Sequence, residues 1–69
     1  PELRARIRRR LAERFEAGLV DEVRRLLASG VPRKRLDVFG LEYRWVAALV
    51  AGEITEPECF EGLATAIAQ

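Results

Sequence analysis

The feature that most restricts the fold of this 69-residue chain is a helical spacing of apolar residues, interrupted by single glycines. In the first 17 residues, apolar side chains recur every four positions, at Leu3, Ile7, Leu11 and Phe15. At about 100° per residue they share one arc of a helix. The glycines that separate the periodic segments are Gly18, Gly30, Gly40 and Gly52. We therefore expect an all-α fold without a convincing strand.

This pattern predicts a compact bundle of about four helices, and we expect residues 1–69 to form a single helical domain. In the second helix, five apolar residues share one face: Leu19, Val20, Val23, Leu26 and Leu27. Pro32 prevents this helix from continuing, so residues 31–39 are predicted to be a loop. The predicted helices cover residues 2–17, 20–29, 40–51 and 56–69.

The third and fourth predicted helices have distinct signatures. Apolar residues surround the third helix instead of forming one stripe, which is typical of a helix that is covered on most sides. We therefore place this helix at the centre, with the sole tryptophan, Trp45, in the core. The fourth helix begins with a capping box, in which the side chains of Thr55 and Glu58 each accept a hydrogen bond from the other's backbone N–H.

Length and composition exclude several classes of protein. With 69 residues, 49% of them apolar, the chain is long enough for one small domain and too apolar for disorder. No apolar run approaches the roughly 18 residues of a membrane span, and the arginine-rich first half excludes a signal peptide. The chain begins at Pro1, lacks methionine and stops at Gln69 inside an apolar-periodic run. We therefore expect it to be a segment of a longer protein.

The residue inventory provides no self-contained active site. Because the chain has no histidine and one cysteine, Cys59, neither a zinc site of the usual ligands nor a Cys–His nucleophile can form. The only lysine lies between two arginines, so no Gly-Lys-Ser/Thr phosphate-binding loop exists. We expect no catalytic, cofactor-binding or metal-ligating residue in this chain. The single cysteine is expected to be a small packing residue, and it fits a reducing, cytoplasmic compartment.

The net charge of +1 conceals an asymmetry along the chain. Residues 1–35 contain eleven Lys/Arg and five Asp/Glu, whereas residues 36–69 contain one Arg and six Asp/Glu. This asymmetry has two interpretations. One is charge complementarity between helices, which we favour, and the other is an anion-binding half.

Basic residues are the remaining candidates for a functional site. Arginine can donate two parallel hydrogen bonds to a phosphate, so exposed arginines can position an RNA backbone without reading its sequence. A solvated helix face is the ordinary alternative. The aromatic ring of Tyr43 is expected to pack in the protein instead of stacking on a base, and Arg44 either pairs with a carboxylate or faces a site elsewhere in the longer protein. The candidate RNA phosphate contacts are Arg6, Arg9, Arg10, Arg33, Lys34, Arg35 and Arg44.

The order and spacing of these segments resemble a known family. They are similar to the C-terminal helical region of tRNA dimethylallyltransferases, also called tRNA isopentenyltransferases or IPP transferases. Each motif is moderately specific, and their combination carries the resemblance. The segments are the start of the first helix from Leu3 to Ile7, the helix from Gly18 to Gly30, the run Gly40-Leu41-Glu42-Tyr43-Arg44, then Gly52, and the capped helix from Thr55 to Gln69.

The resemblance implies a transferase that modifies tRNA. This family transfers a dimethylallyl group from its diphosphate to N6 of the adenosine 3′ of the tRNA anticodon. The resemblance implies that the longer protein has a nucleotide-kinase-like α/β core. This core would carry a P-loop, a Mg²⁺ site and the carboxylate that activates N6. None of those residues matches a position in this chain. The chain would then be an all-α part, excised from a larger α/β enzyme.

The resemblance also implies partners for such a part. It would support the catalytic core and the tRNA side, and it would be inactive alone. Its partners would be tRNA and the core, with dimethylallyl diphosphate bound by the core. We expect no membrane partner and a cytoplasmic location.

Two other interpretations remain open. The short link between the first two helices and the basic first half permit a small helix-turn-helix-like nucleic-acid-binding module. Against it, no helix shows the mixture of Asn, Gln, Ser and Arg that is typical of base-edge readout. The third interpretation is a helical domain that only contacts other proteins.

Overall fold

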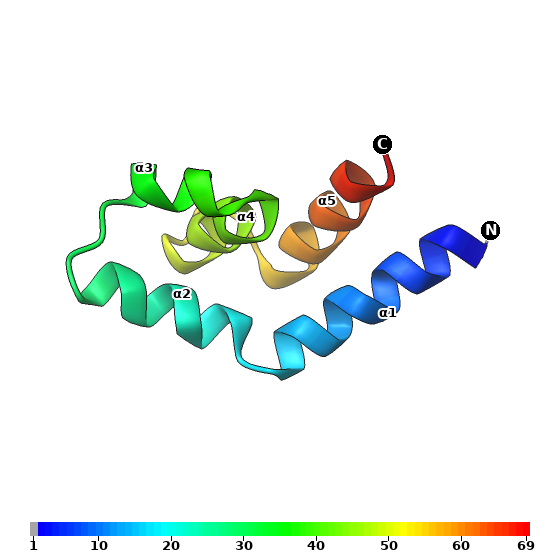
Figure 1. The fold of residues 1–69 in the computed structure, drawn as a ribbon, viewed down its shortest axis with the longest axis horizontal. Helices are drawn as coiled ribbons and strands as arrows, with labels where there is room; N and C mark the ends of the chain where they lie inside the picture. Colours follow the sequence, from blue (N-terminus) through cyan, green and yellow to red (C-terminus); the bar gives the residue numbers. More distant parts are fainter. Residues whose placement is uncertain (1) are drawn as a thin grey trace.

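Five α-helices and one short 3-10 helix form the described part of the chain, residues 2–69 of this computed structural model (Figure 1). They are α1 (Glu2–Glu16), α2 (Leu19–Ala28), α3 (Arg33–Leu36), the 3-10 helix η1 (Asp37–Phe39), α4 (Leu41–Val50) and α5 (Glu56–Ala68). No strand occurs in residues 2–69, so the predicted all-α fold is confirmed, with one helix more than expected. Among the described residues, no helix combines the length and apolarity needed to cross a membrane.

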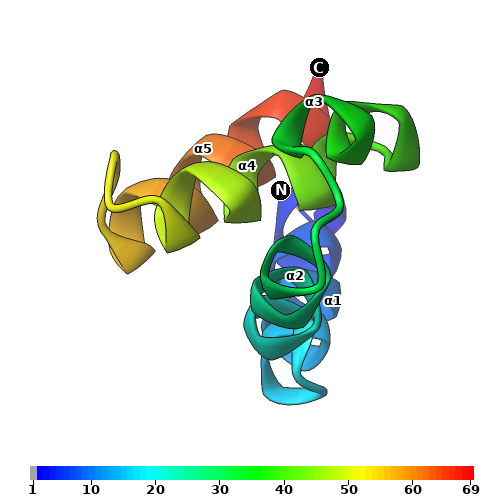
Figure 2. The same ribbon diagram turned by 90° about the vertical axis from the view of Figure 1, so that its left-hand side faces the viewer.

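The helices are arranged in two layers. α1 and α2 form an open V along one side of the molecule, and α4 and α5 lie across from them, with α3 beside α4 (Figure 1, Figure 2). α4 packs against α2, α3 and α5, and α5 packs against α1. The central position predicted for the third helix is therefore confirmed for α4. The molecule measures 40 × 22 × 20 Å along its principal axes.

Gly18 forms the link between α1 and α2. Its φ of 100° lies in the left-handed region, which a residue with a Cβ rarely adopts. Its N–H donates to the Phe15 carbonyl at 3.2 Å, and its carbonyl accepts from the Glu22 N–H at 2.9 Å. Because one residue both ends α1 and begins α2, the two helices diverge as an open V and do not form an antiparallel hairpin (Figure 1).

All five α-helices contribute apolar side chains to one core. One expectation about this core, for Trp45, is wrong, and one residue of the apolar arc of α1, Leu3, lies outside the core. Leu3 is 62% exposed, because the first turn of α1 extends beyond α5 (Figure 1). Trp45 is half-buried, because its indole packs against the core and also lines an open hollow at the surface. The buried core residues are Leu11, Leu19, Val23, Leu36, Val46, Ala47, Cys59, Leu63 and Ala64.

The prediction of a loop over residues 31–39 is also wrong, because α3 and η1 occupy most of it. Pro32 has an extended backbone with φ −65° and ψ 143°, and its carbonyl accepts from the Arg35 N–H at 2.9 Å, which closes the first turn. The side chain of Leu36 is completely buried and fixes this turn against the core. The hydrogen bond to Pro32 and the burial of Leu36 therefore both favour a short helix in this basic stretch.

The start of α5 confirms the predicted capping box. The Thr55 hydroxyl accepts from the Glu58 N–H at 3.3 Å, and Glu58 Oε1 accepts from the Thr55 N–H at 2.7 Å. Further along α5, Gly62 lies directly beneath the Trp45 ring of α4, with no space for a side-chain carbon. The absence of a side chain at residue 62 therefore sets how closely these two helices approach.

A candidate nucleic-acid interface

Three ion pairs join the basic first half of the chain to its acidic second half. Arg8 donates two hydrogen bonds to the carboxylate of Glu61, linking α1 to α5. Arg33 donates two to Glu53, linking α3 to the turn between α4 and α5. These hydrogen bonds lower the pKa of both Glu61 and Glu53. Such pairs support the first interpretation of the uneven charge distribution along the chain, which is charge complementarity between helices.

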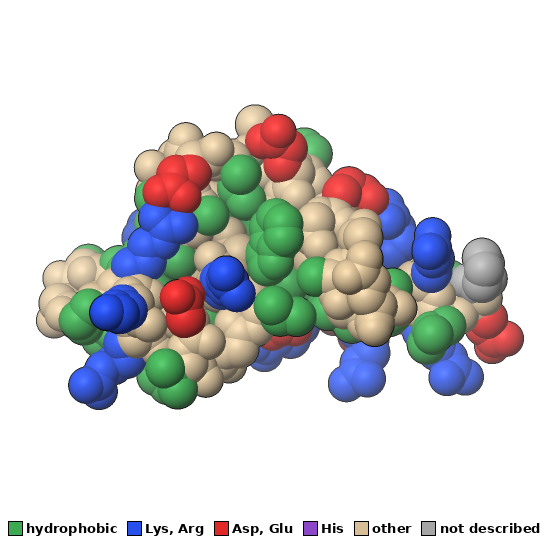
Figure 3. Space-filling model, turned by 90° about the horizontal axis from the view of Figure 1, so that it is seen from above, with side chains coloured by type: hydrophobic (Ala, Val, Ile, Leu, Met, Phe, Trp, Pro, Cys, Tyr) green, Lys and Arg blue, Asp and Glu red, His purple; other side chains and the backbone are tan. Residues whose placement is uncertain are grey.

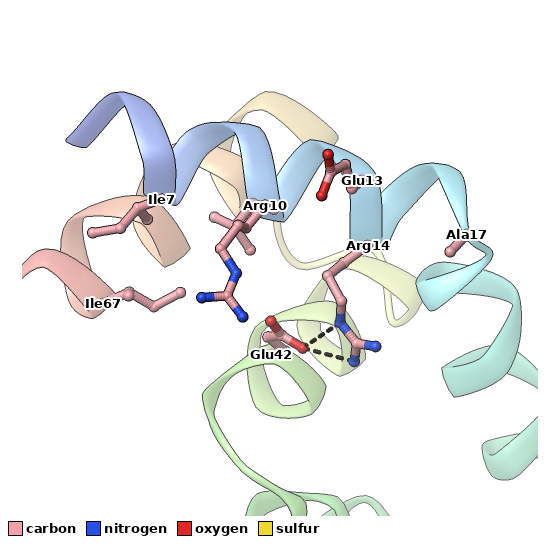
Figure 4. Close-up of a pocket in the computed structure, with 8 residues that line it drawn as sticks. Ile7, Arg10, Glu13, Arg14, Ala17, Glu42 and Ile67 are labelled. Atoms are coloured by element: carbon pink, nitrogen blue, oxygen red, sulfur yellow. Dashed lines mark hydrogen bonds and ion pairs between the residues drawn. The ribbon is translucent and has the colours of Figure 1, made fainter. Parts of the chain in front are cut away.

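The third pair belongs to a polar network that joins α1, α2 and α4. Arg14 Nε donates to Glu42 Oε1 at 2.9 Å (Figure 4). The neighbouring Tyr43 hydroxyl donates to Glu22 Oε2 at 2.6 Å, and this hydrogen bond raises the pKa of Tyr43. The ring of Tyr43 is half-buried against the core. These contacts favour the packing role for Tyr43 over base stacking.

The structure separates the seven predicted phosphate contacts into two groups. Arg6 has a weak partner in Glu2 at 3.9 Å, and Arg33 is occupied by Glu53. The other five have exposed side chains and form no ion pair within residues 2–69. They are Arg9, Arg10, Lys34, Arg35 and Arg44. Figure 3 shows that Lys and Arg side chains gather at both ends of the long axis.

Arg10 extends over a hollow of about 660 Å³ between α1, α4 and α5. The apolar wall of this hollow includes Ile7 and Ile67, while Glu42 lies on the α4 side and is held by Arg14 (Figure 4). An anion that approached Arg10 from solvent would meet one cation without a carboxylate partner among the described residues. Arg10 is therefore an exposed positive charge on the middle of α1, at a hollow that Glu13 and Glu42 also line.

A second hollow, of about 540 Å³, lies beside α3 and η1. Its lining combines the cations Lys34 and Arg35 with the apolar side chains of Pro32, Val38 and Phe39. Sequence reasoning identified the cations but missed Val38 and Phe39 as their neighbours. The signal was present, because residues 34 and 38, and residues 35 and 39, are four apart and share a face once the segment is helical.

Arg44 lies on the exposed side of α4. With Arg33, Trp45, Ala48 and Ile54 it lines a shallow hollow of about 370 Å³. It forms no ion pair with a carboxylate in residues 2–69. The first alternative for Arg44, pairing with a carboxylate, therefore has no support among the described residues.

The described residues contain no cluster of side chains suited to a metal ion. Within residues 2–69, no three His, Cys, Asp or Glu side chains come together in a way that could hold a metal ion. Cys59 is completely buried, and burial raises the pKa of its thiol. The expected packing role of Cys59 is therefore confirmed.

The fold and its surface define a class: a small all-α module with a dense set of internal ion pairs and several exposed cations. A comparison with protein families identifies the family within this class. The family model described as IPP transferase matches residues 1–69, so the chain belongs to this family. The resemblance in the sequence is thereby confirmed.

Individual relatives agree with this assignment. The chain is 52% identical over 67 residues to tRNA dimethylallyltransferase 2 of Shewanella sediminis. It is 48% identical over 66 residues to that of Pelobacter propionicus and 47% identical over 66 residues to that of Bacteroides fragilis. These matches cover 97%, 96% and 96% of this chain, but only 22%, 21% and 22% of the relatives. No solved structure matches the chain.

Proposed function

We propose that this chain is the helical part of a tRNA dimethylallyltransferase, which transfers a dimethylallyl group from its diphosphate to N6 of the adenosine 3′ of the anticodon. The observation that carries the proposal is the 52% identity over 97% of the chain to a protein of that name. The chain spans about 22% of that relative, so the proposal assigns the chemistry to the remainder.

The described residues do not fit Mg²⁺, because no group of three potential ligands lies among them. In this proposal, Mg²⁺, the P-loop and the binding of dimethylallyl diphosphate belong to the catalytic core. The chain alone is then inactive, and its role is to support the core and the side on which tRNA lies. Such an enzyme would act in the cytoplasm.

Contact with tRNA is assigned to the cations that lack an intramolecular partner. Arg33 already donates both ends of its guanidinium to Glu53, so its geometry favours a structural role. Exposed cations without a carboxylate partner can instead exchange counterions for phosphates and fix the position of an RNA backbone. Among the predicted phosphate contacts, these are Arg9, Arg10, Lys34, Arg35 and Arg44.

The first experiment measures dimethylallyl transfer to tRNA by the full-length protein and, separately, by these 69 residues. We expect transfer by the full-length protein only. If the full-length protein fails to modify any tRNA, the proposed function is wrong. If the 69 residues alone transfer the group, the assignment of the chemistry to the core is wrong.

A second experiment tests the phosphate contacts. In the full-length protein, the double variant Lys34→Ala/Arg35→Ala should weaken tRNA binding and reduce the slope of log affinity against log salt by about 2. The variant Arg24→Ala/Arg25→Ala removes the same charge from α2 and serves as the control. If both double variants weaken tRNA binding equally, the effect comes from the net charge of the protein, and a local contact at Lys34 and Arg35 is contradicted.

A further inference from the structure

The hollow beside α3 exposes apolar groups that a solvated loop does not require. Val38 is 84% exposed and Phe39 is 57% exposed, although both belong to the ordered turn of η1. They line the same hollow as Lys34 and Arg35. An aromatic ring and two cations therefore share one face of a short helical segment.

The ring of Phe39 is held in place from one side. Its centroid lies 5.5 Å from that of Tyr43, with the two planes inclined at 46°. Tyr43 is itself fixed by the hydrogen bond of its hydroxyl to Glu22. Because the neighbouring Leu36 is completely buried, the segment that carries Phe39 is anchored to the core. The exposed part of the ring is thus presented to solvent in a defined position.

No carboxylate lines the hollow that contains Phe39. The neighbouring cation Arg33, in contrast, donates two hydrogen bonds to the carboxylate of Glu53. Lys34 and Arg35 form no ion pair within residues 2–69. The hollow consequently favours an anionic partner that also presents a flat apolar group.

We propose that Phe39 stacks on an unpaired base of bound RNA while Lys34 and Arg35 hold the phosphates on either side of that base. The inference rests on the proposed function, in which the partner is tRNA and includes a single-stranded anticodon loop. Unpaired bases are recognised by stacking on aromatic side chains, with cations along the backbone.

The test measures binding of a fluorescently labelled anticodon stem-loop RNA to the full-length protein, without the dimethylallyl donor. Phe39→Ala and Phe39→Leu should each weaken binding about tenfold, because both remove the π face. Phe39→Trp should retain the affinity of the wild type. Leu3→Ala is the matched control, because it removes a similarly exposed apolar side chain far from α3 and should leave binding unchanged.

Two outcomes would overturn the inference. If Phe39→Leu binds as tightly as the wild type, the contact is apolar and not a stack. If Phe39→Ala binds RNA normally but lowers the melting temperature of the full-length protein, the hollow is a surface for packing against protein. Because binding is measured without transfer, a protein that stacks RNA through Phe39 but fails to modify tRNA would contradict only the proposed function.

Discussion

Gly62 shows, at the scale of single residues, how close packing can outweigh helix propensity. Alanine is a better helix former than glycine by about 1 kcal/mol. A Cβ on Gly62, however, would overlap the rigid indole of Trp45, and even the ring atom Cε3 would lie only 3.1 Å away. Overpacking of this kind typically costs about 1–3 kcal/mol. We therefore expect Gly62→Ala to lower the free energy of unfolding, measured by urea denaturation.

The control for this prediction is a double-mutant cycle with Trp45→Phe, which removes the atoms that the new Cβ would meet. In that background Gly62→Ala should be neutral or stabilising. An equal loss of stability in both backgrounds would show that the Trp45 ring is not the cause.

Tyr43 provides a second prediction at this scale. Replacing it with phenylalanine removes the hydrogen bond to Glu22 and should cost about 1 kcal/mol at neutral pH. The hydrogen bond raises the pKa of Tyr43 above its ordinary value of 10.0, because it favours the protonated hydroxyl. Its stabilisation is therefore complete below pH 10.0 and is lost as the pH rises through the raised pKa. The difference between the two proteins, measured by denaturation from neutral to alkaline pH, should shrink there. A constant difference would contradict this account.

The capping box belongs to the scale of the secondary-structure element. Thr55→Ala leaves the Glu58 N–H without its side-chain acceptor, so we expect a loss of about 1 kcal/mol. Thr55→Ser keeps the hydroxyl and is the matched control, with stability close to that of the wild type. Thermal unfolding followed by circular dichroism measures both. Equal losses would assign the effect to the threonine methyl group and not to the cap.

The elements also show how much of this fold could be predicted from the sequence. The long helices were predictable because caps, glycines and apolar periodicity act within a few residues of each other. α3 was not, because four residues are too few for a period, and burial of Leu36 depends on distant helices. Similarly, the cations could be identified from the sequence. The pairing of Arg33 with Glu53 could not, because the two residues are 20 positions apart and only the fold brings them together. The exposure of Phe39 depends in the same way on the fold.

At the scale of the whole molecule, ion pairs between distant residues join the basic first half of the chain to its acidic second half. Glu53 and Glu61 have pKa values below the ordinary 4.5, because Arg33 and Arg8 donate hydrogen bonds to their charged forms. A lowered pKa stabilises the fold above the ordinary value, and this stabilisation is lost as the pH falls through the lowered one. We therefore expect the melting temperature to decrease as the pH falls below about 4.5, and high salt to weaken the effect.

The variant Glu53→Gln/Glu61→Gln isolates the contribution of these pairs. It removes both titrating groups but keeps side chains of the same size. We expect it to be less stable than the wild type at neutral pH and to show a shallower decrease of melting temperature in the acidic range. As a control, Glu13→Gln/Glu16→Gln removes two exposed carboxylates of α1 that form no ion pair within residues 2–69. If both variants follow the acid profile of the wild type, these ion pairs do not stabilise the fold. A shallower profile for Glu53→Gln/Glu61→Gln alone would show that charge complementarity between the two halves stabilises this fold.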